Sequence, residues 1–189
     1  LFGGIGWVGV RGRSGFGQAI AFYVTQTVKL PQALRHRLGH GRTTAAMAIQ
    51  YCDVLAPYRP WFIEEPCQPE DHEGTARVAR ATHIPIAAGE RLCHRREFLP
   101  LLQSGAIAIA QPDVCHAGGL TEVRRIAALC DTFGVSMAPH NPLGPIATMV
   151  NIHLGFATPN FLIQEVMRSD VPSSTTPSGR LSSPPRNSS

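Results

Sequence analysis

Five short apolar segments recur along this chain, and each carries near its end a residue that can bear a charge or bind a metal. The segments read WFIEEP, IPIAAGE, IAIAQPD, VSMAPH and FLIQE, and these residues are Glu64, Glu90, Asp113, His140 and Glu165. The steps between them are 26, 23, 27 and 25 positions. A parallel β/α unit has this length, because the crossover between two parallel strands needs roughly a dozen residues or more and usually contains a helix. The pattern predicts consecutive parallel β/α units.

Parallel strands joined in this way end at the same edge of their sheet, and in a β/α barrel that edge carries the catalytic residues. A polar residue just after a strand also has a simpler explanation, because it can cap the helix that follows. Capping would account for any one of the five residues. It accounts less well for five of them at a regular spacing, so we predict that these side chains converge on one site.

Helical periodicity fills the intervals between the apolar segments. Helices are predicted over residues 43–60, 70–82, 94–105, 118–134 and 145–158. The buried stripe expected in the first helix is Ala46, Ile49, Cys52 or Asp53, and Ala56. In the clearest helix, 118–134, it is Leu120, Val123, Ile126, Ala127 and Cys130. The apolar segments do not alternate with polar residues, as expected of parallel strands that are covered on both faces.

The net charge of +4 is unevenly distributed along the sequence. Residues 1–52 contain six basic residues and no Asp or Glu, whereas all 13 acidic residues lie within 53–170. A basic balance can indicate a nucleic-acid partner, but here the segment with the periodic pattern is acidic. We expect no nucleic-acid partner, and the alternative of a nucleic-acid-binding module in residues 1–52 has only charge in its support.

The five cysteines are scattered and include no C-x-x-C pair, so the sequence predicts neither a disulfide framework nor a structural zinc site. No apolar run approaches the roughly 18 residues of a membrane span. No signal segment opens the chain, so we expect no membrane partner. These features are typical of a cytoplasmic protein with ordinary thiols.

The two ends of the chain differ from the region between them. Residues 1–39 form an atypical Gly/Arg-rich flank, and its first part, with a G-x-G-x-x-G match at 4–9, lacks the strand, helix and acidic residue of a dinucleotide site. Neither a helical nor an alternating period marks that part, and residues 18–30 fit either a strand or a helix. The Ser/Pro-rich tail, 167–189, buries too little apolar surface to order, so we expect it to be disordered. A barrel segment is expected over 40–166.

Short motifs of the central segment closely resemble those of a known enzyme family. They are HGR at 40–42, IEEP at 63–66, GER at 89–91, QPDVCHAGG at 111–119, APHNPLGP at 138–145 and IQE at 163–165. Their order and spacing resemble the mandelate racemase branch of the enolase superfamily, and within it the D-galactonate dehydratase-like sugar-acid dehydratases. The resemblance implies an α/β fold, a partial (β/α) TIM-type barrel like the C-terminal domain of that superfamily, without a counterpart of the N-terminal capping domain.

The resemblance also implies a reaction, in which a proton is removed beside a carboxylate and water is then lost to give a 2-keto-3-deoxy sugar acid. It implies that His140 is the base and that Asp113 hydrogen-bonds the imidazole and raises its basicity. His40 would protonate the departing hydroxyl, and Glu165 would stabilise the enolic oxygen. Asn141 is expected to shape the loop after His140.

Mg²⁺ is the cofactor that the resemblance implies, and a small sugar acid is the substrate. Glu64 and Glu90 would supply two carboxylates to the ion, which prefers oxygen ligands. His116 and Arg91 would line the substrate pocket, although helix capping by His116 and ion pairing by Arg91 fit the sequence equally well. Glu65 is expected at the surface or rim with a salt-bridge partner.

One position departs from the family pattern. The third metal carboxylate should stand two residues before His40, where this chain has Leu38, and residues 1–52 offer no acidic substitute. A site with two carboxylates should bind Mg²⁺ more weakly. We therefore expect impaired activity, with the alternative of a non-catalytic remnant of such an enzyme.

A racemase or cycloisomerase of the same superfamily is the remaining enzymatic alternative. His40 disfavours it, because those relatives usually place a pair of lysines on an earlier strand and the only lysine here is Lys29. The sequence leaves open which sugar acid is used and whether the chain forms homo-oligomers. Our hypothesis for the two flanks is that they are out of frame or otherwise degenerate.

Overall fold

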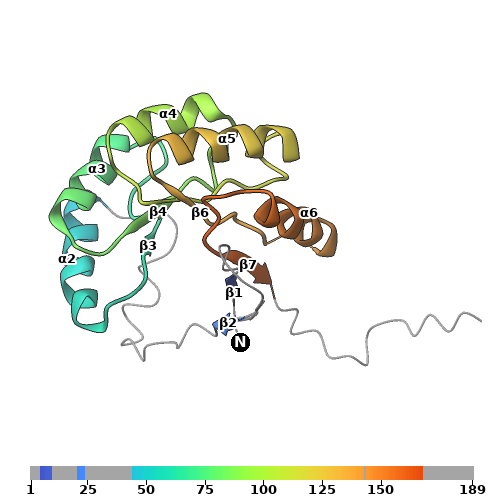
Figure 1. The fold of residues 1–189 in the computed structure, drawn as a ribbon. Helices are drawn as coiled ribbons and strands as arrows, with labels where there is room; N and C mark the ends of the chain where they lie inside the picture. Colours follow the sequence, from blue (N-terminus) through green and yellow to red (C-terminus); the bar gives the residue numbers. More distant parts are fainter. Residues whose placement is uncertain (1–4, 10–20, 24–43, 143, 168–189) are drawn as a thin grey trace, which may run out of the picture.

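The computed structural model describes residues 5–9, 21–23, 44–142 and 144–167 (Figure 1). Its centre is a parallel sheet of four short strands in the order β3-β4-β5-β6. The strands are β3 (Ile63–Glu64), β4 (Ile86–Ala88), β5 (Ile109–Ala110) and β6 (Ser136–Met137). Each strand pairs with the next one along the chain. Consecutive parallel neighbours joined by helices are the connectivity of a β/α barrel, and the sheet is therefore a partial barrel wall.

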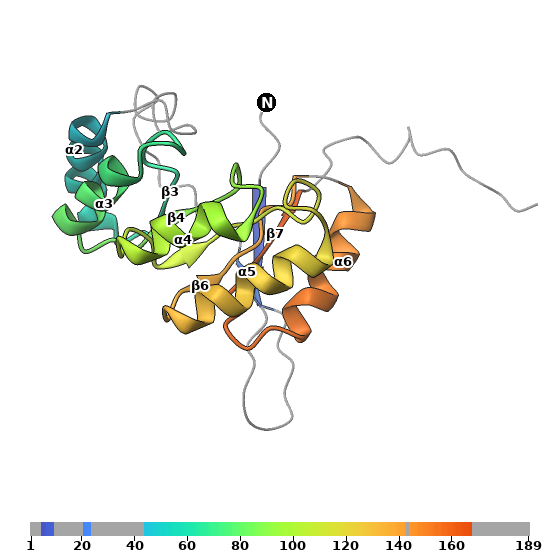
Figure 2. The same cartoon turned by 90° about the horizontal axis from the view of Figure 1, so that it is seen from above.

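The fifth predicted strand extends this wall before it changes partner. Phe161 forms a parallel bridge with Met137, and the backbone N–H of Leu162 donates to the Met137 carbonyl oxygen at 2.8 Å. The chain then enters β7 (Gln164–Met167), which pairs antiparallel with β1 (Ile5–Gly9). Figure 2 shows β1 and β7 side by side. β7 ends one residue beyond the boundary expected for the barrel segment at 166.

Two strands lie in the N-terminal region for which the sequence showed no clear element. β1 pairs antiparallel with β7 on one side and with β2 (Ala21–Tyr23) on the other. Both strands are formed by backbone pairing, which needs free N–H and C=O groups on a neighbour and not a particular side-chain alternation. Periodicity in a glycine-rich segment therefore could not reveal β1. The rest of residues 1–39, and most of the tail, lie outside the described residues.

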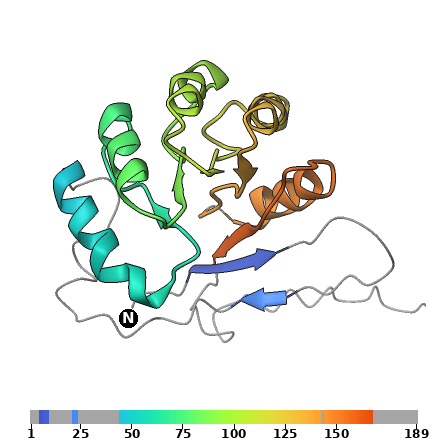
Figure 3. The same ribbon diagram turned by 60° about the vertical axis from the view of Figure 1, so that its left-hand side comes forward.

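All five predicted helices are present, and each is shorter than its predicted range. They are α2 (Ala45–Leu55), α3 (His72–Ala81), α4 (Arg95–Gln103), α5 (Leu120–Thr132) and α6 (Pro145–Phe156), with a 3₁₀ turn, η1 (Ala56–Tyr58), after α2. Figure 3 shows α2 to α6 arranged in an arc around the outer side of the strands. Side-chain caps fix where three helices begin, for example at Asp71, whose Oδ1 accepts from the Gly74 N–H at 2.8 Å.

The buried face of α2 differs from the predicted stripe. Its buried residues are Ala45, Ala48, Cys52 and Leu55, so of the predicted stripe only Cys52 is fully buried and Ile49 packs against the core while partly exposed. Alanine-rich sequence gives little contrast between faces, and the contact with α3 decides which face turns inward. For α5 the prediction holds at Val123, Ile126, Ala127 and Cys130.

Position 120 of α5 is a second correction. Leu120 is 43% exposed, and the residue buried in that first turn is Glu122. The Glu122 carboxylate accepts hydrogen bonds from the backbone and the guanidinium of Arg95, the first residue of α4. An ion pair between two helices therefore replaces an apolar contact there, because a buried carboxylate is tolerated when it is paired.

The inner faces of the helices and the sheet form one apolar core. Its largest fully buried side chains include Phe98, Ile126, Met137 and Leu154. Among the described residues, no helix combines the length and the apolar character needed to cross a membrane. The core supports the strand ends that carry the polar residues described next.

Candidate active site

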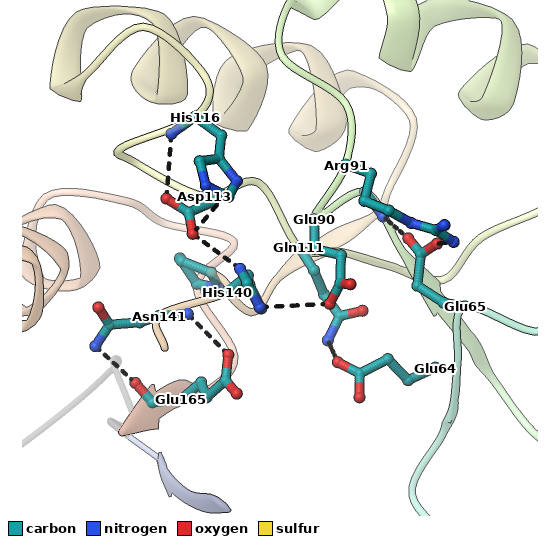
Figure 4. Close-up of polar contacts among 12 residues, drawn as sticks. Glu64, Glu65, Glu90, Arg91, Gln111, Asp113, His116, His140, Asn141 and Glu165 are labelled. Atoms are coloured by element: carbon teal, nitrogen blue, oxygen red, sulfur yellow. Dashed lines mark hydrogen bonds and ion pairs between the residues drawn. The ribbon is translucent and has the colours of Figure 1, made fainter. Parts of the chain in front are cut away.

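Four of the five predicted polar residues come from the carboxyl-terminal ends of successive strands. Glu64 is the last residue of β3, whereas Glu90, Asp113 and His140 follow β4, β5 and β6 within three residues. Glu165 lies within β7. Figure 4 shows these side chains gathered around His140, which contacts Asp113 on one side and Glu90 on the other. The predicted convergence of these side chains is present.

His140 and Asp113 form a hydrogen-bonded pair. Nδ1 of His140 lies 2.8 Å from Oδ2 of Asp113. The other carboxylate oxygen, Oδ1, accepts from the backbone N–H groups of Cys115 at 2.6 Å and His116 at 3.2 Å. Asp113 is only 1% exposed, so this carboxylate has a fixed orientation. Nε2 of His140 is left to face the centre of the site.

The surroundings shift the pKa values of this pair in opposite directions. Burial alone would raise the pKa of Asp113, but the hydrogen bonds from His140 and from the Cys115 N–H outweigh it, and the pKa is lowered. Burial alone would lower the pKa of His140, but the Asp113 hydrogen bond and the charges of Glu90 and Glu165 outweigh it, and the pKa is raised. The result is an anionic aspartate beside an imidazole of increased basicity.

Glu90 reaches the site through an unusual backbone position. Its Oε2 lies 3.5 Å from Nε2 of His140. The preceding residue, Gly89, has φ +126°, and a Cβ there would lie 2.5 Å from Cε1 of Phe98. Only glycine fits both the conformation and the space. The G-E step of the GER motif therefore turns the chain so that the Glu90 side chain points inward.

Glu64 is half-buried, and its Oε1 accepts a hydrogen bond from Nε2 of Gln111 at 2.6 Å. Burial, followed by the charges of Glu90 and Glu165, raises the pKa of Glu64 to about 7, against the lowering effects of Gln111 and His140. Three carboxylates thus repel one another within a small volume. A divalent cation fits this arrangement, because Glu64 and Glu90 offer the hard oxygen ligands that Mg²⁺ takes and its charge would offset the repulsion.

Glu165 is held by the residue that follows His140. The backbone N–H of Asn141 donates to Oε2 of Glu165 at 2.7 Å, and the Asn141 side-chain amide donates to the Glu165 carbonyl oxygen at 3.1 Å. Burial raises the pKa of Glu165, and the charges of Glu90 and Asp113 add to that effect. Asn141 was expected to shape its loop, and its contacts do so by joining the loop to β7.

Glu65 occupies a buried position and not the surface or rim position that the sequence suggested. It is 4% exposed, because its Oε1 accepts from the Gly89 N–H at 2.8 Å and its Oε2 accepts from Nη2 of Arg91 at 2.6 Å. The predicted salt-bridge partner is therefore present. Figure 4 shows the Arg91 guanidinium turned toward Glu65 and apart from His140. Substrate contact by Arg91 stays a prediction.

His116 lies beside the pair, with its ring centroid 6.4 Å from that of His140. Its side chain is 51% exposed and its Nδ1 is 3.8 Å from Oδ2 of Asp113. The predicted general acid, His40, and the substituted metal position, Leu38, lie outside the described residues.

Sequence reasoning missed the contact of Gln111 with Glu64 and the bond from Asn141 to Glu165. Gln111 stands two residues before Asp113, and Asn141 directly follows His140, each within one of the family motifs. That adjacency is the one signal that could have singled them out.

A partial β/α barrel whose strand ends carry these carboxylates and a His–Asp pair is the architecture of one protein class. Residues 30–184 match the enolase C-terminal domain-like family, and the chain belongs to that family. The chain is 50% identical over 126 residues to a D-galactonate dehydratase of Ralstonia nicotianae, and 51% identical over 126 residues to one of Cronobacter sakazakii. Both alignments cover 67% of this chain and 33% of the relative.

Solved structures agree with this assignment. A mandelate racemase/muconate lactonizing enzyme from Sulfitobacter sp. is 44% identical with a TM-score of 0.67, covering 69% of this chain and 33% of that one. A related protein from Roseovarius sp. TM1035 is 40% identical with a TM-score of 0.67 and the same coverage. The chain therefore spans about a third of the length of the proteins it matches. The predicted D-galactonate dehydratase-like resemblance is confirmed.

Proposed function

We propose that this chain contributes the proton-abstracting side of a magnesium-assisted sugar-acid dehydratase site. The observation that carries the proposal is the His140–Asp113 pair, in which Nε2 of His140 lies 3.5 Å from Oε2 of Glu90. A base next to a carboxylate cluster that can hold a divalent cation suits a substrate whose own carboxylate would be bound by that cation, beside the carbon to be deprotonated. The D-galactonate dehydratases that match the chain support the substrate class.

In the proposed reaction, Nε2 of His140 takes the proton from the carbon next to the substrate carboxylate. Nδ1 keeps its proton, because the hydrogen bond to anionic Asp113 stabilises the imidazolium that forms. Glu165, whose pKa is raised mainly by burial, would hydrogen-bond the enolic oxygen. When bound by Glu64 and Glu90, Mg²⁺ would neutralise negative charge that develops on the substrate carboxylate.

The second half of the reaction breaks the bond between carbon 3 and its hydroxyl oxygen. His40 would donate the proton that lets this oxygen leave as water, and the enol that results would tautomerise to the 2-keto-3-deoxy acid. His140 and His40 thus have complementary roles, one accepting and one donating a proton.

A non-catalytic role is the second candidate, and one specific observation favours it. Leu38 stands where the family pattern places the third metal carboxylate, and a leucine has no lone pair to offer. Weak metal binding would then leave the His140–Asp113 pair without the charge it needs to stabilise an enediolate.

Isotope exchange tests the proposal without requiring complete turnover. The chain is incubated with D-galactonate and Mg²⁺ in deuterium oxide, and deuterium at carbon 2 and 2-keto acid are measured. We expect deuterium at carbon 2 or formation of 2-keto acid from the native chain, and neither from a His140→Asn variant. His153→Asn, which changes an exposed histidine of α6, is the matched control and should behave as native. A native chain that gives neither product would contradict the proposal.

A further inference from the structure

The outer side of the His140–Asp113 pair carries a second set of metal-binding atoms. Oδ2 of Asp113 lies 2.8 Å from Nδ1 of His140 and 3.8 Å from Nδ1 of His116. One ligand atom from each of the three residues lies within 4.8 Å of the other two. This set has two imidazole nitrogens, whereas Glu64 and Glu90 offer oxygen alone. Two donor sets of different chemistry therefore lie side by side.

The separations suit an ion of the zinc type. Zn²⁺ binds histidine nitrogen and carboxylate oxygen at about 2.0–2.2 Å with tetrahedral geometry, so neighbouring ligand atoms lie about 3.3 Å apart. The observed distances of 2.8 and 3.8 Å fall on either side of that value. Small rotations of the two imidazole rings would equalise them. The His116 side chain has room to turn, because it is 51% exposed.

The carboxylate is already oriented for such a role. Its Oδ1 accepts two backbone N–H groups, from Cys115 and His116, which fixes Oδ2 toward the imidazoles. Hydrogen bonds to the second oxygen of a ligating carboxylate are the usual support of a metal site.

We infer that Asp113, His116 and His140 form a binding site for a zinc-type transition metal ion, distinct from the proposed magnesium site at Glu64 and Glu90. Imidazole ligands select zinc, copper and nickel over magnesium. Binding of the ion through the Nδ1 lone pair of His140 would require the ring proton to move from Nδ1 to Nε2, so the nitrogen proposed as the base could no longer accept a proton. This inhibitory consequence rests on the proposed function, whereas the metal site itself does not.

Cobalt(II) is the probe, because it accepts zinc ligands and its visible absorption reports a four-coordinate environment. Metal-free chain is titrated with cobalt, and we expect one bound ion that zinc displaces and millimolar magnesium does not. A His116→Gln variant should bind cobalt at least about tenfold more weakly, since losing a ligand should cost at least as much as losing a supporting contact. His153→Gln, at an exposed position of α6, should bind as the native chain does.

A Glu64→Gln variant separates this inference from the proposed function. It should bind cobalt with native affinity while magnesium binding is lost, and that result would uphold the transition-metal site whether or not the chain is a dehydratase. The inference is overturned if the native chain binds no cobalt, if His116→Gln binds it as well as native, or if Glu64→Gln alone loses it. Circular dichroism of each variant confirms that it is folded.

Discussion

Asn141 makes two hydrogen bonds to Glu165. Its backbone N–H donates to the carboxylate at 2.7 Å, and its side-chain amide donates to the backbone carbonyl at 3.1 Å. The same amide donates to Oγ1 of Thr148 at 2.8 Å. The loop that follows His140 is thereby tied to β7 and to α6. The residue that follows the proposed base His140 thus also holds the proposed catalytic carboxylate of Glu165.

Replacing this amide should destabilise the fold. Asn141→Ala keeps the backbone N–H but removes two side-chain hydrogen bonds, one to Oγ1 of Thr148 and one to the Glu165 carbonyl, which keeps Gln164 Nε2 as a donor at 2.9 Å. At roughly 0.5–1.5 kcal/mol for each bond, unfolding in urea should show a loss of about 1–3 kcal/mol. Thr148→Val removes the bond from the Asn141 amide and an exposed bond from Oγ1 of Thr148 to the Gly144 carbonyl, and it leaves the amide bonded to Glu165, so it should cost less. Equal stability of Asn141→Ala and the native chain would show that the amide does not hold the two segments together.

Gly89 should be intolerant of any side chain. Gly89→Ala adds a Cβ 2.5 Å from Cε1 of Phe98 at φ +126°, so we expect a loss of about 2–5 kcal/mol from overpacking and backbone strain together. Gly105→Ala is the control, because φ is +65° there and no atom lies within 4 Å of the added Cβ. It should cost about 1–2 kcal/mol. Similar losses in thermal or urea unfolding would contradict the packing argument.

Two of the Arg–Glu pairs among the described residues, Arg91–Glu65 and Arg80–Glu73, offer a matched comparison of buried and exposed charge. Arg91→Met leaves Glu65, whose side chain is 3% exposed, with the Gly89 N–H as its remaining donor. Because Arg91 itself is 32% exposed, we expect a loss of about 2–3 kcal/mol, below the range for fully buried pairs.

Arg80→Met breaks a pair with Glu73 whose side chains are 61% and 82% exposed. It should change the free energy of unfolding by less than about 1 kcal/mol. Urea unfolding of the two variants at one pH measures both. A larger loss for Arg80→Met would show that burial of Glu65 is not what makes the first pair important.

High pH should destabilise the chain through Cys130. Burial raises the pKa of its thiol from 9.0 to about 12. The unfolded thiol ionises first, so the contribution of Cys130 is intact below pH 9 and is lost as the pH rises from 9 toward 12. Up to about 4 kcal/mol is at stake, since each pKa unit corresponds to about 1.4 kcal/mol.

Cys130→Ala should have a flatter stability curve between pH 8 and 11 than the native chain, although it starts lower because of the cavity it creates. Cys93→Ala, at an exposed thiol, should keep the native pH dependence. Parallel curves for Cys130→Ala and the native chain would contradict the assignment.

Much of the fold and site was predictable because the chain repeats one physical unit. The spacing of the polar residues after the apolar segments predicted the order of β3 to β6, and it predicted that Asp113, His140 and Glu90 would meet. What failed depended on three-dimensional context. The inward face of the alanine-rich α2 is chosen by its packing partner, and Glu65 is buried because Arg91 and the Gly89 N–H happen to satisfy it.

Backbone pairing explains a further miss. β1 pairs with β7 through main-chain hydrogen bonds, and the side-chain pattern of a glycine-rich sequence does not indicate such pairing. In the site, the bonds from Gln111 to Glu64 and from Asn141 to Glu165 join residues of different segments. The spacing of residues within one segment cannot predict such contacts.

Magnesium calorimetry on three proteins tests the central claim most directly, namely that Glu64 and Glu90 form a metal site beside His140. We predict weak binding of one Mg²⁺ by the native chain, no binding by Glu64→Gln, and at least about tenfold tighter binding by Leu38→Asp, which adds the carboxylate that the family pattern expects. Identical titrations for the native chain and both variants would contradict the account.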